Sequence, residues 1–289
     1  MEPGIRIDAA VSMALTQVQG MGGPPLLNEA VRYAVLPGGA RVRPRLCLAV
    51  ASACAESHPM ATDGAAAAIE LIHCASLVHD DMPCFDNADL RRGKPSVHKA
   101  YGERIALLTG DALIVLAFEI LARRALAVPE RLAGMVSILS RSAGMPAGIV
   151  AGQAWECETD VDLEIYQRQK TGALFSGATM LGAAAAGSAT EPWRALGQGI
   201  GEAFQIADDI LDAASTEDQI GKPVGQDEAL DRPSAVRELG LSGALGKLQH
   251  LVDDAIDSVP DCPGRDGLIG QVRAQAERLV PARIMSMAA

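Results

Sequence analysis

Two acidic clusters constrain the fold and the chemistry of this chain more than any other feature. One covers Asp80–Asp86 (DDMPCFD) and the other covers Asp208–Asp212 (DDILD). Each follows a long apolar pattern of helical period, where a run of solvated charge is not expected. Carboxylates that converge on one cavity bind hard divalent cations, and Mg²⁺ held in this way usually shares its coordination shell with substrate phosphates. The two clusters therefore predict a site for a diphosphate bridged by metal ions.

The composition favours helices that pack closely through small side chains. Hydrophobic residues make up 49% of the chain but aromatic residues only 3%, and alanine is abundant. Alanine has the highest helix propensity, and the β-branched and aromatic runs typical of strands are few. The Gly- and Pro-rich breaks between apolar patterns are too short to be domain linkers. We expect a single all-α domain over residues 1–289, a bundle of about ten or more helices around a central cavity.

The charge balance excludes one class of partner. The net charge is −11, whereas a nucleic-acid-binding surface needs a basic footprint. An anionic substrate must therefore be bound by a local basic cluster. Most basic residues are arginines, which suit bidentate contacts to phosphate.

The cysteines and the apolar segments bear on the cellular compartment of the protein and on whether it spans a membrane. Its six cysteines are scattered without a C-x-x-C pair, which predicts neither a zinc site nor a disulfide framework and favours a reducing cytoplasm. The N-terminus shows no signal-peptide pattern. The uncharged stretch Thr171–Thr190 is rich in glycine and hydroxyl side chains, so we expect a buried core helix rather than a transmembrane segment.

Local geometry should gather the carboxylates of each cluster. The alanine-rich helix predicted over Ala65–Asp81 ends just before Pro83, which places Asp80 and Asp81 on its last turn. The turn broken by Pro83 could return Asp86 toward them. Four residues separate Asp208 from Asp212, so both lie on one helix face, with Asp209 beside them. One cluster alone is explained equally well as a solvated helix end, but two clusters with nearby basic groups favour a site.

Basic and amide side chains follow at several places in the chain. Arg91 and Arg92 come directly after the first cluster, where they could pair with its carboxylates or bind two separate diphosphates. Arg41 and Arg43 follow a glycine turn. Lys170-Thr171 and Phe204-Gln205 add another cation and an amide.

These segments resemble the trans-isoprenyl diphosphate synthases of the polyprenyl synthetase family. The matching segments are Leu77–Leu113, Lys170–Phe175, Phe204–Asp212 and Gly221–Asp227. With the other markers they span residues 38 to 232, and their order and spacing are highly specific. The four-residue spacer of the first aspartate motif resembles bacterial farnesyl synthases and the geranylgeranyl synthases of carotenoid and bacteriochlorophyll pathways. The segments Ile72–Leu77 and Asp231–Arg237 most closely resemble the geranylgeranyl enzymes of photosynthetic bacteria.

The resemblance implies a role for each matching residue. Two Mg²⁺ ions would be held by Asp80, Asp81 and Asp86, and a third by Asp208 and, to a lesser degree, Asp209 and Asp212. The allylic diphosphate would be contacted by Arg91, Lys170, Thr171, Gln205, Lys222 and Arg232, with Phe204 beside Gln205 in the substrate site. Isopentenyl diphosphate would be bound by Arg41, Arg43, His73 and Arg92. Without the resemblance, His73 would be interpreted as a packed core histidine. The resemblance also implies a homodimer.

The chain departs from the family pattern at two basic positions. A family lysine that would contact isopentenyl diphosphate is replaced by Ala40, and a later lysine is replaced by Arg232. The loss of one charged hydrogen bond costs roughly 1.5–3 kcal/mol if nothing replaces it. We therefore expect weaker binding of isopentenyl diphosphate but retained catalysis.

The implied reaction needs no side-chain nucleophile. The Mg²⁺ ions and cationic side chains neutralise the allylic diphosphate and make it a better leaving group. The double bond of isopentenyl diphosphate attacks the resulting allylic cation, and a proton is then lost, with the departing diphosphate as its acceptor. Both anions must be held side by side.

Product length should depend on the space along the helix below Asp80, because each isoprene unit needs about one more helical turn, roughly 5 Å. Ideal geometry places Ser76 under Asp80. The family instead emphasises Ala75, where similar farnesyl enzymes carry a bulky aromatic residue. Both side chains are small here, so we expect geranylgeranyl diphosphate (C20) and a shift to C15 in Ala75→Tyr. Phe118 on the next helix is either the floor of the cavity or an ordinary core residue.

The sequence leaves four alternative functions to compare. Farnesyl diphosphate synthesis (C15) uses the same mechanism and is the nearest. A non-catalytic subunit of a heteromeric synthase would be expected to lose aspartates, and this chain keeps both sets. A terpene cyclase needs an Asn/Ser/Glu metal motif, yet asparagine occurs only at Asn28 and Asn87. A Ca²⁺-binding module needs an alternating acidic loop that the sequence lacks.

Overall fold

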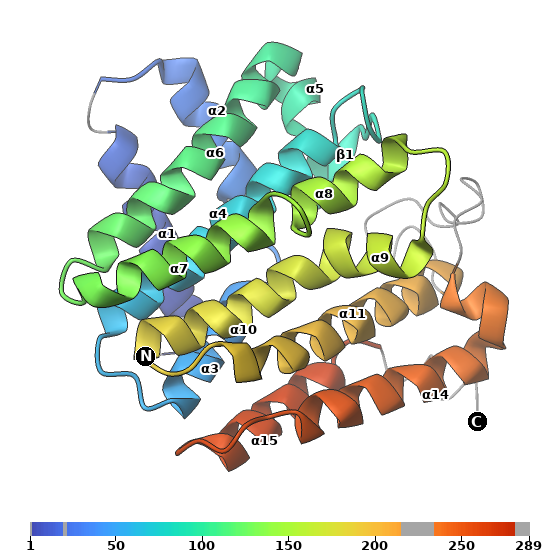
Figure 1. Cartoon of the computed structure of the whole chain (residues 1–289). Coiled ribbons are helices and arrows are strands. Elements are labelled where there is room, and N and C mark those ends of the chain that lie inside the picture. The colour runs from blue at the N-terminus through green and yellow to red at the C-terminus, as the bar shows by residue number, and fades with distance from the viewer. Residues whose placement is uncertain (1, 20–21, 215–233, 281–289) are drawn as a thin grey trace.

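The computed structural model describes residues 2–19, 22–214 and 234–280, and this part of the chain is almost entirely helical (Figure 1). The α-helices are α1 (Pro3–Gln19), α2 (Pro25–Val35), α3 (Val42–Ala53), α4 (Pro59–Asp80), α5 (Val97–Tyr101), α6 (Glu103–Arg124), α7 (Pro129–Ala143), α8 (Ile149–Ala154), α9 (Leu163–Gln167), α10 (Ala173–Ala186), α11 (Arg194–Ala214), α14 (Ala235–Asp257) and α15 (Arg265–Ala276). The shorter elements are the 3₁₀ turns η1 (Trp155–Cys157) and η3 (Glu191–Trp193), the π-helical turn η2 (Arg168–Gly172), and the antiparallel strands β1 (Leu90–Arg91) and β2 (Lys94–Pro95). The predicted all-α fold is confirmed.

Small residues let α10 occupy the centre of the bundle. A Cβ atom added at Gly177 would lie 2.4 Å from the Ser142 hydroxyl of α7, and one added at Gly182 would lie 2.3 Å from the Cys47 carbonyl oxygen of α3. Neighbouring backbones therefore approach at distances that larger side chains would prevent. Every residue from Leu174 to Ala185 is buried, so the uncharged stretch forms the core helix that was expected.

Two hydrophobic clusters make up the core of the described residues. One is formed mainly by α1, α2, α4, α6 and α7, and the other by α11, α14 and α15. Both α3 and α10 contribute buried side chains to each cluster: Phe175 of α10 belongs to the second and Leu174, its neighbour, to the first. These two helices join the clusters into a continuous bundle. That the whole chain is a single domain stays a prediction.

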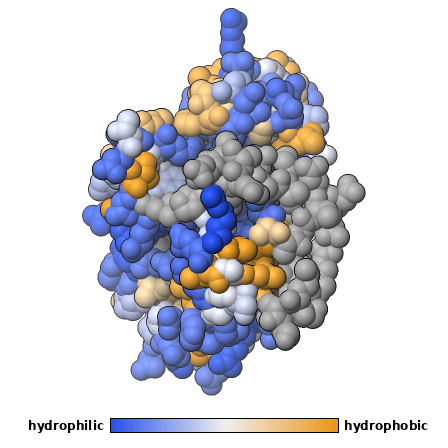
Figure 2. Space-filling view, turned by 90° about the vertical axis from the view of Figure 1, so that its right-hand side faces the viewer, coloured by the Kyte–Doolittle hydropathy of each residue, from blue (hydrophilic) through white to orange (hydrophobic). Residues whose placement is uncertain are grey.

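Both acidic clusters lie at the same end of the bundle. The helix α4 starts with Pro59 at its first position and ends at Asp80, with Asp81 as its C-cap. The helices α4 and α11 run toward the right-hand end of the view, where β1 and α9 also lie (Figure 1). Seen face-on, the described surface of this end is largely hydrophilic, with hydrophobic side chains gathered in patches (Figure 2).

Within the part of the chain that the structure describes, two helices are long and apolar enough to cross a membrane. In α4 the apolar window is 78% buried inside the bundle, as in the core helix of a soluble protein, whereas in α6 it is only 44% buried. The outer face of α6 exposes Leu107, Leu108 and Val115.

Candidate active site

The turn after α4 folds back on the helix end, as the sequence predicted. The backbone N–H of Asp86 donates to the carbonyl oxygen of Asp80 (3.0 Å), and that of Ala88 donates to the carbonyl oxygen of Asp81 (3.1 Å). Asp81 is almost fully buried. The backbone therefore brings Asp86 close to the two aspartates at the helix end.

Arg91 and Lys170 are the cations paired with Asp80 and Asp81. We call these four residues the acidic site. The Nε of Arg91 donates to both carboxylate oxygens of Asp81 (3.0 and 3.2 Å). The Nζ of Lys170 lies 3.5 Å from Asp80 Oδ1, and Arg91 Nη2 lies 3.8 Å from Asp80 Oδ2. Burial raises the pKa of Asp81 even though Arg91 opposes the shift. Arg91 was expected either to pair with the carboxylates of the first cluster or to bind a diphosphate. In this structure it pairs with Asp81.

The acidic site fits Mg²⁺. Its donors are carboxylate oxygens, which Mg²⁺ prefers, and the buried Asp80 Oδ1 accepts no hydrogen bond. Among the described residues, no three acidic, histidine or cysteine side chains already form a metal-binding group. A Mg²⁺ ion bound to these carboxylates would therefore need further ligands in its coordination shell. The phosphate oxygens of a substrate are ligands of this kind.

Glu156 holds Lys170 in place and was missed by the sequence analysis. Its carboxylate forms an ion pair with Lys170 and accepts hydrogen bonds from Tyr166 Oη (2.6 Å) and Gln153 Nε2 (2.8 Å). Burial alone would lower the pKa of Lys170, but Asp80, Tyr166 and Glu156 raise it to about 12. Lys170 therefore stays protonated. No spacing rule identifies Glu156, since it precedes Lys170 by 14 residues.

Lys170 lies on the π-helical turn η2 between α9 and α10. The turn packs closely on α8, because a Cβ atom added at Gly152 would lie only 2.3 Å from the backbone nitrogen of Lys170. Thr171, the next residue, donates from Oγ1 to Gln205 Oε1 of α11 (3.1 Å). The structure thus joins Thr171 and Gln205, two residues that the resemblance assigned to the allylic diphosphate.

The second acidic cluster divides its aspartates between two sides of α11. Asp208 and Asp212 are half-buried, whereas Asp209 is only 3% exposed. The Asp209 carboxylate accepts from Ala235 N at the start of α14 (2.8 Å) and from Gln205 Nε2 (3.1 Å). In this structure Asp209 thus binds the start of α14, and the metal-binding role that the resemblance gave it to a lesser degree stays a prediction. Asp208 and Asp212 are the more exposed candidate ligands of this cluster.

A second cationic group lies about 10 Å along α4 from Asp80, given the rise of a helix over seven residues. It consists of Arg43, His73 and Arg92, which we call the basic site. Arg43 Nη1 lies 3.4 Å from His73 Nε2, and the Arg43 guanidinium lies 4.4 Å from the centroid of the Phe175 ring. Among the described residues, neither Arg43 nor Arg92 has a carboxylate partner within ion-pair distance.

The pKa values in the basic site are lowered mainly by burial. Burial lowers the pKa of Arg43 to about 10; Glu70 opposes this shift and Arg92 adds to it. Burial and then Arg43 lower the pKa of His73 well below its ordinary value. A nearby anion would favour the charged form of both groups, so the basic site is a candidate for binding phosphate.

Arg41 lies in an environment that the resemblance did not indicate. It was predicted to bind isopentenyl diphosphate, and here its side chain is buried and donates to Glu70 Oε1 (2.6 Å) and to the carbonyl oxygen of Val35 (3.0 Å). A second carboxylate oxygen, Asp8 Oδ1, lies 3.4 Å from its Nε. The guanidinium is therefore bound within the core, and Arg43 is the arginine of this turn that belongs to the basic site.

The candidate chain-length residues occupy different environments. Ala75 is 1% exposed within the core, whereas Ser76 is half-buried on the helix face that also carries His73 and Asp80. The Ser76 hydroxyl donates to the carbonyl oxygen of His73 (2.8 Å). Phe118 is partly buried against the first core cluster. Ser76 therefore lies where a side chain would meet a substrate tail that follows α4.

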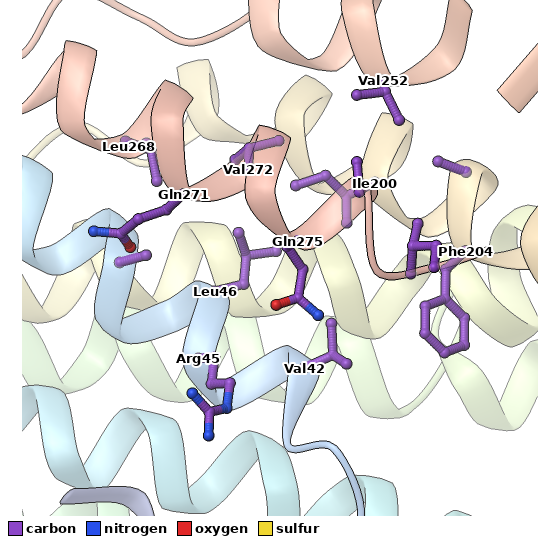
Figure 3. A pocket seen from close by; sticks show the side chains of 14 residues that line it. Val42, Arg45, Leu46, Ile200, Phe204, Val252, Leu268, Gln271, Val272 and Gln275 are labelled. Atoms are coloured by element: carbon purple, nitrogen blue, oxygen red, sulfur yellow. The ribbon is translucent and has the colours of Figure 1, made fainter. Parts of the chain in front are cut away.

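Phe204 lines an apolar pocket between α3, α11, α14 and α15 (Figure 3). Its ring centroid lies 5.5 Å from that of Phe175, and Val42 and Leu46 face it across the pocket. Phe204 thus contacts the ring of Phe175, the same ring that Arg43 contacts. Lys222 and Arg232, predicted to contact the allylic diphosphate, lie outside the described residues.

Comparisons with known proteins agree with this geometry. Residues 24–262 match the family model described as polyprenyl synthetase. The geranylgeranyl diphosphate synthase of Cereibacter sphaeroides is 54% identical over 96% of this chain and 97% of its own, and that of Rhodobacter capsulatus is 50% identical over 95% of both chains. Among solved structures, a geranyltransferase from Helicobacter pylori complexed with magnesium and isoprenyl diphosphate is 30% identical, with a TM-score of 0.79 over 94% of this chain and 96% of that one. The fold, the site and these full-length relatives together establish that the chain belongs to the polyprenyl synthetase family.

Proposed function

We propose that this chain is a geranylgeranyl diphosphate synthase, a Mg²⁺-dependent prenyltransferase that condenses isopentenyl diphosphate head-to-tail with allylic diphosphates. One observation carries the proposal. Two cationic groups lie next to α4, one at Asp80 and Asp81 and one at His73, and among the described residues only the first is paired with carboxylates. The first group suits a diphosphate that arrives with metal ions, and the second suits a diphosphate bound directly. Relatives that span nearly the whole chain support the same reaction.

In this mechanism the acidic site holds the allylic diphosphate. Mg²⁺, three ions per site in our proposal, would be held by Asp80, Asp81 and Asp86 on one side and by Asp208 and Asp212 on the other, and would supply charge neutralisation of the leaving group. Arg91 would exchange its carboxylate partner for a phosphate oxygen as substrate binds. Lys170 and Gln205 would add donors to the same diphosphate.

The basic site would hold isopentenyl diphosphate beside it. Arg43, His73 and Arg92 orient this second anion so that its double bond faces the allylic carbon. As the allylic carbon–oxygen bond breaks, the double bond forms the new carbon–carbon bond, and the departing diphosphate takes the proton that restores a double bond. The bonds that form and break thus balance, and the reaction needs no nucleophile from the protein.

Product length is proposed to be C20, with C15 as the alternative. Ser76→Tyr fills the open face of α4 below Asp80, so it should shorten the product to C15. Ala75→Tyr instead forces a large ring into the packed core, which should cost roughly 1–3 kcal/mol of stability. Product analysis of both variants distinguishes the two positions. An unchanged product from folded Ser76→Tyr removes this explanation of chain length.

The remaining proposals concern the setting of the enzyme. The exposed apolar face of α6, with Leu107, Leu108 and Val115, suits a second copy of this chain and hence a homodimer. All six cysteines are free, in keeping with a cytoplasmic enzyme. The similarity to enzymes of photosynthetic bacteria suggests carotenoid synthesis as one use of the product.

A single assay tests the proposed function. Purified protein is incubated with Mg²⁺, isopentenyl diphosphate and one allylic primer (C5, C10 or C15), and the products are separated by carbon number. The proposal predicts C20 from each primer, with EDTA abolishing turnover. C15 as the end product selects the farnesyl alternative. Activity only after addition of a second chain selects the non-catalytic subunit.

A further inference from the structure

Lys94 attaches the β1–β2 hairpin to the end of α2. Its ammonium donates to the carbonyl oxygens of Tyr33 (2.9 Å) and Leu36 (3.0 Å). Carbonyl groups at the carboxyl end of a helix lack partners within the helix and form the negative end of its dipole. The same ammonium lies 4.2 Å from the centroid of the Tyr33 ring, a cation–π contact. Lys94 therefore makes two hydrogen bonds to carbonyl groups at the end of α2 and one contact with the ring of Tyr33.

Tyr33 completes the attachment from the opposite direction. Its hydroxyl donates to the carbonyl oxygen of Pro95, the residue after Lys94 (2.7 Å). Its ring packs edge-on against Tyr101, with 5.2 Å between the centroids. We call Lys94 and Tyr33, with the carbonyl groups of Leu36 and Pro95, the Lys94 clamp. None of these groups belongs to the acidic site or the basic site.

The clamp joins the two chain segments that carry arginines of the basic site. On one side, Leu36 begins the turn that leads through Gly39 to Arg43. On the other side, Arg92 precedes Lys94 by two residues. The segments meet closely, since a Cβ atom added at Gly39 would lie 2.9 Å from the guanidinium carbon of Arg92. The position of Arg92 relative to this turn therefore depends on the attachment next to it.

Like charges give a reason for an attachment at this place. Arg43 and Arg92 both carry positive charge on the two segments that meet at Gly39. Repulsion between them would favour separation of the hairpin from the turn when no anion is bound. The hydrogen bonds of Lys94 and Tyr33 oppose that motion, so the site is already arranged when the diphosphate arrives, and less ordering has to accompany binding.

We propose that Lys94 is a positioning residue for the second diphosphate, acting through the backbone of residues 36–39 and through Arg92. The proposal rests on the proposed function and deepens it. Arg91 of the acidic site is the strand partner of Lys94 on this hairpin, but its guanidinium is held by its own hydrogen bonds to Asp81. Arg92 has no carboxylate partner among the described residues, so the proposal predicts a larger effect on the basic site than on the acidic site. Loss of the clamp should weaken isopentenyl diphosphate binding more than binding of the allylic substrate.

The test compares steady-state constants for both substrates in four variants. Lys94→Met keeps the length of the side chain and removes its charge; we expect the KM for isopentenyl diphosphate to rise roughly tenfold, with kcat and the KM for the allylic substrate within about twofold of wild type. Lys94→Arg should restore most of the affinity. Lys99→Met is the matched control, because Lys99 lies in the next helix and pairs only with exposed Asp89 (2.8 Å).

Tyr33→Phe keeps the proposal testable if Lys94→Met does not fold. It removes a single oxygen and keeps the ring contact with Tyr101, and it should raise the same KM roughly threefold. A parallel rise in both KM values, or no change in either, overturns the proposal. An inactive wild-type protein would instead overturn the proposed function, so the two failures are distinguishable.

Discussion

The acidic site and the basic site differ in how their charges are balanced. In the acidic site, Asp81 and Asp80 are already paired with Arg91 and Lys170. In the basic site, neither Arg43 nor Arg92 has a carboxylate partner within ion-pair distance among the described residues. In the first arrangement the carboxylates are paired with cations and must exchange partners to bind substrate together with metal. The second carries unpaired positive charge and needs only an anion. The two sites thus represent two ways of binding the same chemical group.

The largest expected effect comes from breaking the acidic site. Asp80→Asn removes a metal ligand and the partner of Lys170, so kcat should fall roughly 10²–10³-fold. Initial rates at saturating substrate and rising Mg²⁺ measure this loss. Asp89→Asn is the control, because Asp89 is exposed and belongs to neither site. If Asp80→Asn kept more than a tenth of the wild-type rate, the assigned metal site would be wrong.

Breaking the basic site should give a smaller and more selective effect. Arg43→Gln removes a charged donor worth roughly 1.5–3 kcal/mol, so the KM for isopentenyl diphosphate should rise about 10–100-fold. The KM for the allylic substrate should not change. Arg45→Gln, on the same helix but partly exposed and 3.6 Å from Glu2, controls for loss of charge. An equal rise in both constants would contradict separate sites.

Adding charge to the basic site should sharpen the contrast. Ala40 is exposed in the turn before α3, so a lysine there can extend without repacking the core. Ala40→Lys should lower the KM for isopentenyl diphosphate by up to about tenfold, and Ala40→Gln, similar in length but uncharged, should not. Identical constants for wild type and Ala40→Lys would show that the missing lysine is already compensated.

The smallest expected effect is a dependence of stability on pH. The pKa of His73 is lowered well below 6.5 in the folded chain. As the pH falls below 6.5, the unfolded chain takes up a proton at this position and the folded chain does not, so the free energy of unfolding decreases. Urea unfolding at pH 7.5 and 5.5 should therefore show a smaller decrease for His73→Gln than for wild type.

The exposed His250 provides the control for this measurement. His250→Gln should keep the wild-type dependence on pH. If His73→Gln and His250→Gln lost equal stability between the two pH values, the environment of His73 would not be the cause.

The sequence predicted those features that depend on local geometry. Asp80 and Asp81 at the helix end and the return of Asp86 follow from helix period and from Pro83. Features that depend on distant partners could not be predicted. Arg41 binds Glu70, 29 residues away, and Asp209 caps a helix that begins 26 residues later. Their residue types matched the family motif, but the contacts that decide their roles arise only when the helices pack.

The π-helical turn η2 has a consequence for how this region tolerates change. In a regular helix, one added residue rotates everything beyond it by about 100°, which would turn the small residues of α10 away from α3 and α7. A π-helical turn instead accommodates one extra residue within its own wider turn of backbone. The residues of α10 that follow it therefore keep their orientation toward α3 and α7. Lys170 and Thr171, which lie within the turn, can thus change position without rotating the central helix.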